Sequence, residues 1–386
     1  MNILWLASWY PHYNDSFNGD FIKRHALALS KYNELTLIYL TTNSLDKKFD
    51  GVKTSHNREG SLRELIAEYS RPKQEGLIGK LRSFLKYNSY FKQIVEEHIA
   101  KKGVPDIVHV QVPFRAGWIG IWLKRKYKIP LVVTEHWAGY DRQNPDNYFT
   151  RGYYFKYLVG RTLKAADYIT PVSEDLAERL KSIFGKMRSK VIPNSVDTDL
   201  FYPGNNSSLK FRFVHNTSPD DLHKNTVGVL EALGKLKEVN TNWECVIFGK
   251  PSHGVMEKAS ELGLNGMVEF LGLISHERVA EIMRGASAFI NFSNFENQPC
   301  SILEALCCGL PVIASRVGGI AEVIDEENGL LIAPRQINSL YNAMYSLVGG
   351  DIVFFKDEIA KNAKKKFSEA SIGREFFDFY SEILKK

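Results

Sequence analysis

The sequence has few cysteines and no pattern that would put them to use. Its 386 residues contain four, namely Cys245, Cys300, Cys307 and Cys308. Adjacent cysteines are poor disulfide partners, and no C-x-x-C pair or His/Cys cluster indicates zinc. These absences exclude a disulfide framework and predict reduced thiols, as in a cytoplasmic protein.

Long apolar runs and a nucleotide fingerprint are also missing. No run of about 18 apolar residues occurs, so no membrane-spanning helix is expected. The opening MNILWLASWY lacks the basic leader and cleavage site of a signal peptide, and it is typical of a first strand. No G-x-G-x-x-G follows that strand, which disfavours a dinucleotide-dependent dehydrogenase.

Positive charge is in mild excess, with a formal net charge of +6. Much of it falls in the basic, aromatic-bearing region 71–128. This region fits a solvated face with extended lysines, or a basic, aromatic-bearing helix that rests on anionic lipid at the inner side of a membrane. No recognition motif accompanies the charge, so no nucleic-acid partner is expected.

Short apolar runs alternate with amphipathic stretches, which predicts βαβ units around parallel sheets. The expected strands of the first half are 2–8, 35–40, 106–111, 131–136, 168–173 and 190–194. After the polar, turn-rich stretch 201–210 the pattern restarts, with expected strands 211–216, 243–249, 268–272, 288–293, 311–315 and 329–333. The sequence therefore predicts two doubly wound α/β domains, 1–200 and 201–366, and residues 41–100 are the least interpretable part.

Two such domains form a cleft, and ligands of parallel sheets bind beyond the carboxyl ends of the strands. The residues to examine are therefore those that follow the expected strands. They include the loop 8–19, His136, the stretch 216–224, Gly249 and the segment ENQPCSILE at 296–304.

ENQPCSILE places two carboxylates astride a predicted helix, 299–308, with Pro299 in its first position and Gly309 at its end. Glu296 precedes the helix, and the side chain of Glu304 leans back toward its N-terminus. The free N–H groups of Cys300, Ser301 and Ile302 would point into the same space and favour phosphate. Carboxylates on either side accept hydrogen bonds from hydroxyls, so the pattern favours a nucleotide sugar. The alternative is that both glutamates merely stabilise a helix start.

The same stretch resembles the donor site of retaining GT-B glycosyltransferases of the family-4 type, whose motif is E-x7-E. The phrases WYPHYNDSFNGDFIKRHALAL, TEHWAGY, VIPNSVDTDLFYP and VGGIAEVIDEENGLLIAP resemble other parts of that family. The resemblance implies a GT-B fold, with two Rossmann-like domains that face a central cleft. It also implies that the last segment, 367–386, is a helix that crosses back to the first domain.

The resemblance further implies roles for individual residues. Glu296, Lys224 and His136 would act at the reacting sugar and the diphosphate, Glu304 would hold the ribose, and Gly19 would let the first loop approach the phosphates. Asn216 stands where many relatives have an arginine. Because asparagine carries no charge, stabilisation of the diphosphate would depend more heavily on Lys224 and the helix N-terminus. The other residues assigned to donor binding are Asn297, Gln298, Cys300, Ser301, Gly249, Lys250 and Ile274.

The implied reaction transfers a hexose-type sugar, with retention, from a nucleotide diphosphate to a hydroxyl of a glycan or a lipid-linked acceptor. No cofactor or metal is expected. The D-x-D sequence at Asp197 and Asp199 lies in the domain junction and is interpreted as a turn, and Asp220-Asp221 is interpreted as a loop. Two alternatives remain: an epimerase of the same fold, and a non-catalytic subunit that binds a nucleotide sugar or glycan.

Overall fold

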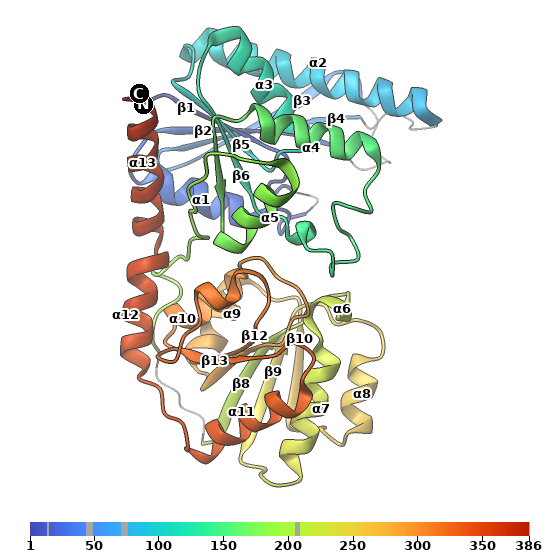
Figure 1. The fold of residues 1–386 in the computed structure, drawn as a ribbon, viewed down its shortest axis with the longest axis vertical. Coiled ribbons are helices and arrows are strands. Elements are labelled where there is room, and N and C mark those ends of the chain that lie inside the picture. The colour runs from blue at the N-terminus through green and yellow to red at the C-terminus, as the bar shows by residue number, and fades with distance from the viewer. Residues whose placement is uncertain (14, 44–48, 71–75, 205–208, 386) are drawn as a thin grey trace.

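The computed structural model contains two α/β domains, one above the other in Figure 1. It describes residues 1–385 except 14, 44–48, 71–75 and 205–208. The first sheet has seven strands in the order β3-β4-β2-β1-β5-β6-β7, and only the β3–β4 pair is antiparallel. Its strands are β1 (Ile3–Ala7), β2 (Leu35–Thr42), β3 (Val52–Glu59), β4 (Leu62–Tyr69), β5 (Ile107–Gln111), β6 (Leu131–Glu135) and β7 (Tyr168–Pro171).

The second sheet has six parallel strands in the order β10-β9-β8-β11-β12-β13. They are β8 (Phe211–Asn216), β9 (Trp243–Phe248), β10 (Val268–Gly272), β11 (Ala288–Asn291), β12 (Val312–Ser315) and β13 (Gly329–Ile332). All six strands expected in this half of the chain are present. Two parallel sheets with the same winding confirm the predicted GT-B architecture.

Helices cover both faces of each sheet, as apolar strands with no polar alternation require. In the first domain they are α1 (Asp20–Ser30), α2 (Gly76–Lys102), α3 (Arg115–Tyr127), α4 (Tyr153–Ala165) and α5 (Glu174–Phe184). In the second they are α6 (Asp221–Lys224), α7 (Thr226–Lys237), α8 (Val255–Glu261), α9 (His276–Arg284), α10 (Cys300–Cys307) and α11 (Ile337–Gly349). Central strands such as β1, β5 and β6 are buried along their whole length.

Strand order places the crevices of the two sheets. β1 lies between β2 and β5, and β8 lies between β9 and β11. At these points consecutive connections leave in opposite directions, so the loops diverge and open a crevice at the carboxyl ends of the strands. The loops after β1, β5, β8 and β11 are therefore the ones that border the cleft.

Two expectations about the first domain need correction. Strands β3 and β4 were not predicted, and β3 shows no apolar pattern because seven of its eight residues are exposed. The basic, aromatic-bearing helix expected in region 71–128 is present as α2. The expected strand 190–194 is absent. Its chain makes two hydrogen bonds beside β7, from Lys190 N to Ile169 O and from Ile192 N to Pro171 O. The next N–H in this alternation belongs to Asn194, and it donates to Gln298 Oε1 of the other domain at 2.6 Å, so the ladder stops there.

The chain ends in two helices, α12 (Lys356–Phe367) and α13 (Glu369–Leu384), that run along one side of both domains in Figure 1. α13 packs on α1, where Gly373 lies so close to the Ala28 carbonyl that a Cβ would stand 1.9 Å from it. Trp5 Nε1 donates to the Tyr380 hydroxyl at 3.1 Å. The predicted crossing of the C-terminal helix back to the first domain is confirmed.

Within the described ranges, no helix combines the length and apolar character needed to cross a bilayer.

Candidate functional site

Glu296 and Lys224 form a buried ion pair at the crevice of the second sheet. Lys224 Nζ lies 2.5 Å from Glu296 Oε1, and both side chains are at most 9 % exposed. Ser293 Oγ donates to the same oxygen at 2.9 Å, and His223 Nε2 lies 3.2 Å from it. Burial raises the pKa of Glu296, but Lys224 and then His223 outweigh it and hold the pKa well below its usual range. The carboxylate is therefore ionised at neutral pH.

Two aspartates place Lys224. Asp220 accepts from Leu222 N at 3.0 Å and caps the short helix α6, and Asp221 Oδ1 accepts from Thr226 N at 2.7 Å at the start of α7. Asn225, between the two helices, has a left-handed φ of 51°. The prediction of a simple loop at Asp220-Asp221 is therefore wrong, because these side chains satisfy the N–H groups of two helix starts.

Glu304 lies on α10 and meets Arg24 of the first domain. Arg24 Nη1 is 2.5 Å and His276 Nε2 is 2.9 Å from Glu304 Oε1. Arg24 Nη2 also lies 2.7 Å from Asp20. Burial raises the pKa of Glu304, but Arg24 and then His276 more than offset this and lower the pKa to about 2.

The two glutamates share a pattern of hydrogen bonding. In each, the protein's donors converge on Oε1. No residue in the described part of the chain donates to Oε2 of either side chain. Each carboxylate is thus fixed through one oxygen and retains acceptor capacity on the other, which suits a ligand with hydroxyl groups.

The start of α10 differs from the prediction in two respects. Pro299 is the N-cap, with φ −71° and ψ 121°, and the helix begins at Cys300. The N–H of Ile302 donates to Pro299 O at 3.1 Å, so it is not free, and the expectation that it faces a ligand is wrong. The N–H groups of Cys300 and Ser301 remain as the donors of this helix end. Burial raises the pKa of the Cys300 thiol to about 12, so that thiol is protonated and uncharged.

Asn297 and Gln298 join the two domains. Asn297 Nδ2 donates to His136 O at 3.0 Å and Asn297 Oδ1 accepts from Ser173 Oγ at 2.7 Å. Gln298 Oε1 accepts from Asn194 N at 2.6 Å. These contacts commit both side chains to the interface, so the structure gives them the role of positioning the loop that carries Glu296.

His136 follows β6 and packs between two aromatic rings. Its ring centroid lies 4.4 Å from that of Phe21 and 5.3 Å from that of His25. Burial lowers its pKa well below the usual range, and the nearby Asn194 side chain offsets this only in part. Neither ring nitrogen is in hydrogen-bond geometry with a residue that the structure describes. The imidazole is therefore neutral and retains one donor and one acceptor for a ligand.

The other predicted donor residues border the same crevices. Gly19 is the N-cap of α1 with a φ of 71°, and an added Cβ would come within 2.9 Å of the Trp9 backbone. Gly249 has a φ of 102°, and its Cβ would stand 2.3 Å from Thr217 O. Both positions therefore require glycine. Asn216 ends β8 with its Oδ1 unpaired and buried, Lys250 is exposed after β9, and Ile274 is half-buried after β10.

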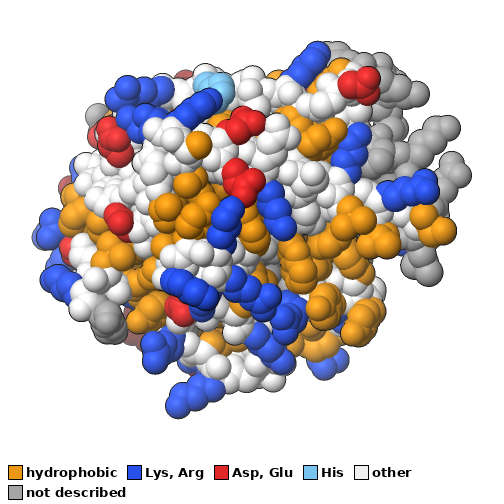
Figure 2. Space-filling model, turned by 90° about the horizontal axis from the view of Figure 1, so that it is seen from above, with side chains coloured by type: hydrophobic (Ala, Val, Ile, Leu, Met, Phe, Trp, Pro, Cys, Tyr) orange, Lys and Arg blue, Asp and Glu red, His pale blue; other side chains and the backbone are white. Residues whose placement is uncertain are grey.

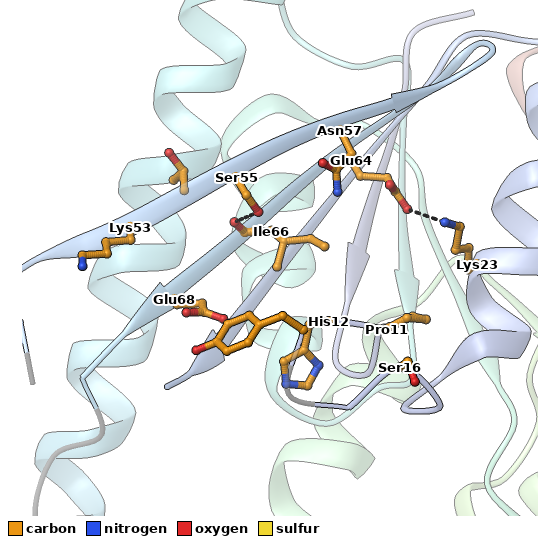
Figure 3. A pocket seen from close by; sticks show the side chains of 12 residues that line it. Pro11, His12, Ser16, Lys23, Lys53, Ser55, Asn57, Glu64, Ile66 and Glu68 are labelled. Carbon is orange, nitrogen blue, oxygen red and sulfur yellow. Dashed lines mark hydrogen bonds and ion pairs between the residues drawn. The ribbon is translucent and has the colours of Figure 1, made fainter. Parts of the chain in front are cut away.

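The first domain has two cavities near the cleft. One, of about 480 Å³, lies between Pro11, His12, Tyr13 and Ser16 on one side and strands β3 and β4 on the other, and the Lys23–Glu64 ion pair lines it (Figure 3). The other, of about 560 Å³, is lined by Trp9, Val112, Glu135 and Trp137, which follow or end β1, β5 and β6. This second cavity, called here the aromatic cavity, flanks His136 and so adjoins the loop that carries Glu296.

Glu135 holds the loop at the base of the aromatic cavity. Its Oε1 accepts from the N–H groups of His136 and Trp137 at 2.8 and 3.0 Å, and its Oε2 accepts from the Tyr140 hydroxyl at 2.7 Å. Burial outweighs these hydrogen bonds and raises the pKa of Glu135 to about 7.

Sequence reasoning missed Arg24, His223 and His276. Arg24 stands five positions after Gly19, on the first helix beyond a cleft loop, and that place is its only signal. His223 precedes Lys224, and its ring stacks on Phe295 with centroids 4.9 Å apart. The aspartates of D-x-D form a turn as predicted, with Asp199 N donating to Asp197 Oδ1 at 3.0 Å. Within the described ranges, no group of three or more His, Cys, Asp or Glu side chains is arranged to hold a metal ion.

The chain resembles known glycosyltransferases in sequence. Residues 205–366 match the family Glycosyl transferases group 1, and residues 55–200 match Glycosyltransferase Family 4. An uncharacterized glycosyltransferase, MJ1178, of Methanocaldococcus jannaschii is 30 % identical over 73 % of this chain and 76 % of its own length. The alpha-monoglucosyldiacylglycerol synthase of Streptococcus pneumoniae is 26 % identical over 74 % of this chain and 68 % of its own.

Among solved structures, the sucrose-phosphate synthase of Thermosynechococcus elongatus superimposes with a TM-score of 0.78. It is 20 % identical and covers 100 % of both chains, which bears on the fold alone. The sequence matches show that the chain belongs to the group 1 glycosyltransferases of the family-4 type.

Proposed function

We propose that this chain is a retaining glycosyltransferase that moves a hexose-type sugar from a nucleotide diphosphate to an acceptor hydroxyl. One observation carries the proposal. Glu296 and Glu304 flank the start of α10, each ionised and each fixed through Oε1 by a basic side chain. This spacing matches a ligand with hydroxyls at both ends and phosphates between them.

In the proposed complex, Oε2 of Glu304 accepts from the ribose hydroxyls and Oε2 of Glu296 accepts from hydroxyls of the donor sugar. The diphosphate lies between them, against the N–H groups of Cys300 and Ser301 and the ammonium of Lys224. Lys224 uses one N–H on Glu296, which leaves two for phosphate oxygens. His136 offers its neutral imidazole to the sugar from the opposite domain.

In the proposed reaction, the bond between the anomeric carbon and the diphosphate oxygen breaks while the acceptor oxygen bonds to the same face of that carbon. The acceptor proton passes to the departing diphosphate. Negative charge grows on that group, and Lys224 with the α10 start stabilises it where it develops. Glu296 stabilises the positive charge of the oxocarbenium-like transition state through the sugar hydroxyls and its own charge.

We further propose that the reaction needs no metal. Lys224 is buried beside the phosphate position, and an ammonium with two helix N–H groups supplies the positive charge that a cation would otherwise bring.

The proposed acceptor is a hydroxyl of a glycan or of a lipid-linked glycan, bound in the first domain. The aromatic cavity supports this, because aromatic walls stack on sugar rings and its base adjoins the loop of Glu296. The alpha-monoglucosyldiacylglycerol synthase among the relatives is named for a glycolipid product.

The test incubates candidate nucleotide sugars with and without acceptor glycolipids, and follows both substrates by mass spectrometry. The proposal expects acceptor-dependent sugar transfer that Lys224→Ala abolishes. Conversion of donor sugar without acceptor would favour an epimerase instead. Binding of nucleotide sugar without any turnover would favour a non-catalytic subunit.

A further inference from the structure

An exposed apolar surface surrounds the mouth of the aromatic cavity. On α2, Ile78, Leu81 and Leu85 are 68, 57 and 57 % exposed, and their spacing places them on one face of the helix. On α4, Tyr153, Tyr154 and Tyr157 are 82, 48 and 43 % exposed. We call these six residues the rim. Soluble proteins rarely expose so many large apolar side chains together, so the rim indicates a binding surface.

Ring contacts join the two halves of the rim into one surface. Phe84 of α2 lies 5.7 Å from Tyr154 of α4 and 5.9 Å from Trp118 of α3, measured between ring centroids. Trp118 lies 6.4 Å from Tyr157. Phe84 and Trp118 thus connect the α2 and α4 parts of the rim through ring contacts.

The charges around the rim have one sign. The stretches 76–95 and 147–166 contain no acidic residue, and they carry Lys80, Arg82, Lys86, Lys92, Arg151, Lys156, Arg161 and Lys164. Figure 2, which views the molecule from above the first domain, shows orange and blue side chains interspersed, with few red ones. Apolar side chains among basic ones, without acids, match the interface of an anionic bilayer. A second copy of this surface would instead place like charges together.

The cavity opens between the two helices that bear the rim. α2 lines it with Lys80, Phe84 and Tyr87, and α4 lines it with Tyr154 and Phe155. Lys80 and Arg115 contribute positive charge to its wall, and neither has an acidic partner among the described residues. Arg151, also in the wall, pairs with Asp146. A molecule held in the bilayer would therefore reach the cleft through an aromatic passage with cations near its mouth.

We propose that the rim docks on an anionic membrane and that the aromatic cavity takes the head group of a lipid acceptor that carries phosphate, with Lys80 and Arg115 on the phosphate. This inference rests on the proposed function for the identity of the cavity's ligand, but the docking does not. The proposal also changes which helices contact the membrane, compared with the contact expected from the sequence for region 71–128. The first turns of α2 keep it, α4 joins it, and α3 lies largely beneath the surface, with its apolar residues Ala116, Ile119, Ile121 and Leu123 buried.

Vesicle flotation tests the docking. We compare vesicles of phosphatidylcholine with vesicles that contain 30 mol % phosphatidylglycerol, using wild type and the double variant Leu81→Ser/Leu85→Ser. Wild type should float with the anionic vesicles and lose binding in high salt, and the variant should float at least tenfold less. The control Val353→Ser/Phe355→Ser changes side chains 72 and 74 % exposed on the other domain and should float like wild type.

Two results would overturn the docking. One is wild type that remains in the bottom fraction with anionic vesicles, and the other is a rim variant of unchanged Tm that floats as well as wild type. Glu296→Gln should float normally, because it does not touch the rim. Loss of sugar transfer with intact flotation would thus separate a failure of the proposed reaction from a failure of the docking.

The preference of the cavity for a phosphate head group is tested by binding of dodecyl phosphate and of dodecanol. The readout is the fluorescence of Trp9 and Trp137, which line the cavity. Dodecyl phosphate should bind more tightly than dodecanol. The ratio of the two dissociation constants should shrink at least tenfold in the double variant Lys80→Ala/Arg115→Ala. Arg125→Ala, an exposed cation on the same domain, serves as the matched control. Equal binding of the two probes to wild type, or an unchanged preference in the double variant, would overturn the phosphate assignment.

Discussion

The guanidinium of Arg24, in the first domain, lies 2.5 Å from the carboxylate of Glu304, in the second. Both side chains are buried, at 14 and 5 % exposure. The pair joins the domains at the position proposed for the nucleotide ribose. It keeps Glu304 charged and engages only Oε1, so Oε2 has no donor among the described residues.

The Arg24–Glu304 pair should make the stability of the fold depend on pH in the acidic range. The pKa of Glu304 falls from about 4.5 to about 2, so its ionisation stabilises the fold by roughly 3 kcal/mol above pH 4.5. That contribution is lost as the pH falls from about 4.5 through about 2. Arg24→Gln should therefore lower Tm at pH 7 and flatten the acid limb of a Tm–pH curve. A variant that keeps the wild-type curve would show that the pair contributes nothing.

Lys224 should act mainly on the chemical step. Lys224→Ala removes the charge that faces the leaving diphosphate, and kcat should fall roughly 100-fold or more. The control Lys365→Ala removes an exposed cation in the same domain, far along the chain from the predicted donor residues, and should retain nearly full kcat. Steady-state kinetics with saturating donor make the comparison. Equal rates for Lys224→Ala and wild type would exclude Lys224 from leaving-group stabilisation.

Glu135 should make stability fall as the pH rises. Its pKa is raised to about 7 by burial, so the unfolded state releases the proton first. Stability is then lost between about pH 4.5 and pH 7, by roughly 3 kcal/mol in total. Glu135→Gln keeps the acceptor oxygen for the two backbone N–H groups and should remove this slope in urea unfolding at pH 5 and pH 8. An unchanged slope would place the titration on another group.

Chelation should leave transfer intact. Because Lys224 and the α10 start supply the positive charge, addition of EDTA after removal of free metal should reduce the initial rate by less than twofold. A rate that collapses with EDTA and recovers with Mg²⁺ or Mn²⁺ would refute the metal-independent proposal.

Much of the fold was predictable because its strands are short apolar runs that end in polar residues. β8 and β11 were found in this way, and Glu296 and Lys224 follow from their positions after those strands. The polar edge strand β3 was not predictable, because it buries almost nothing. A partner 280 residues away, as Arg24 is for Glu304, leaves no local signal. The stretch 190–194 shows the converse. It looked like a strand, but after two hydrogen bonds beside β7 its next N–H, that of Asn194, donates to Gln298 of the other domain.

Titration calorimetry with UDP, GDP and ADP tests the proposed donor site, on wild type and Glu304→Gln at a temperature where both proteins are folded. We expect one of the three nucleotides to bind wild type. We also expect that loss of the charged ribose contact weakens binding of that nucleotide roughly tenfold in the variant. A nucleotide that binds both proteins equally would contradict the assignment of Glu304 and, with it, the proposed position of the donor between the two glutamates.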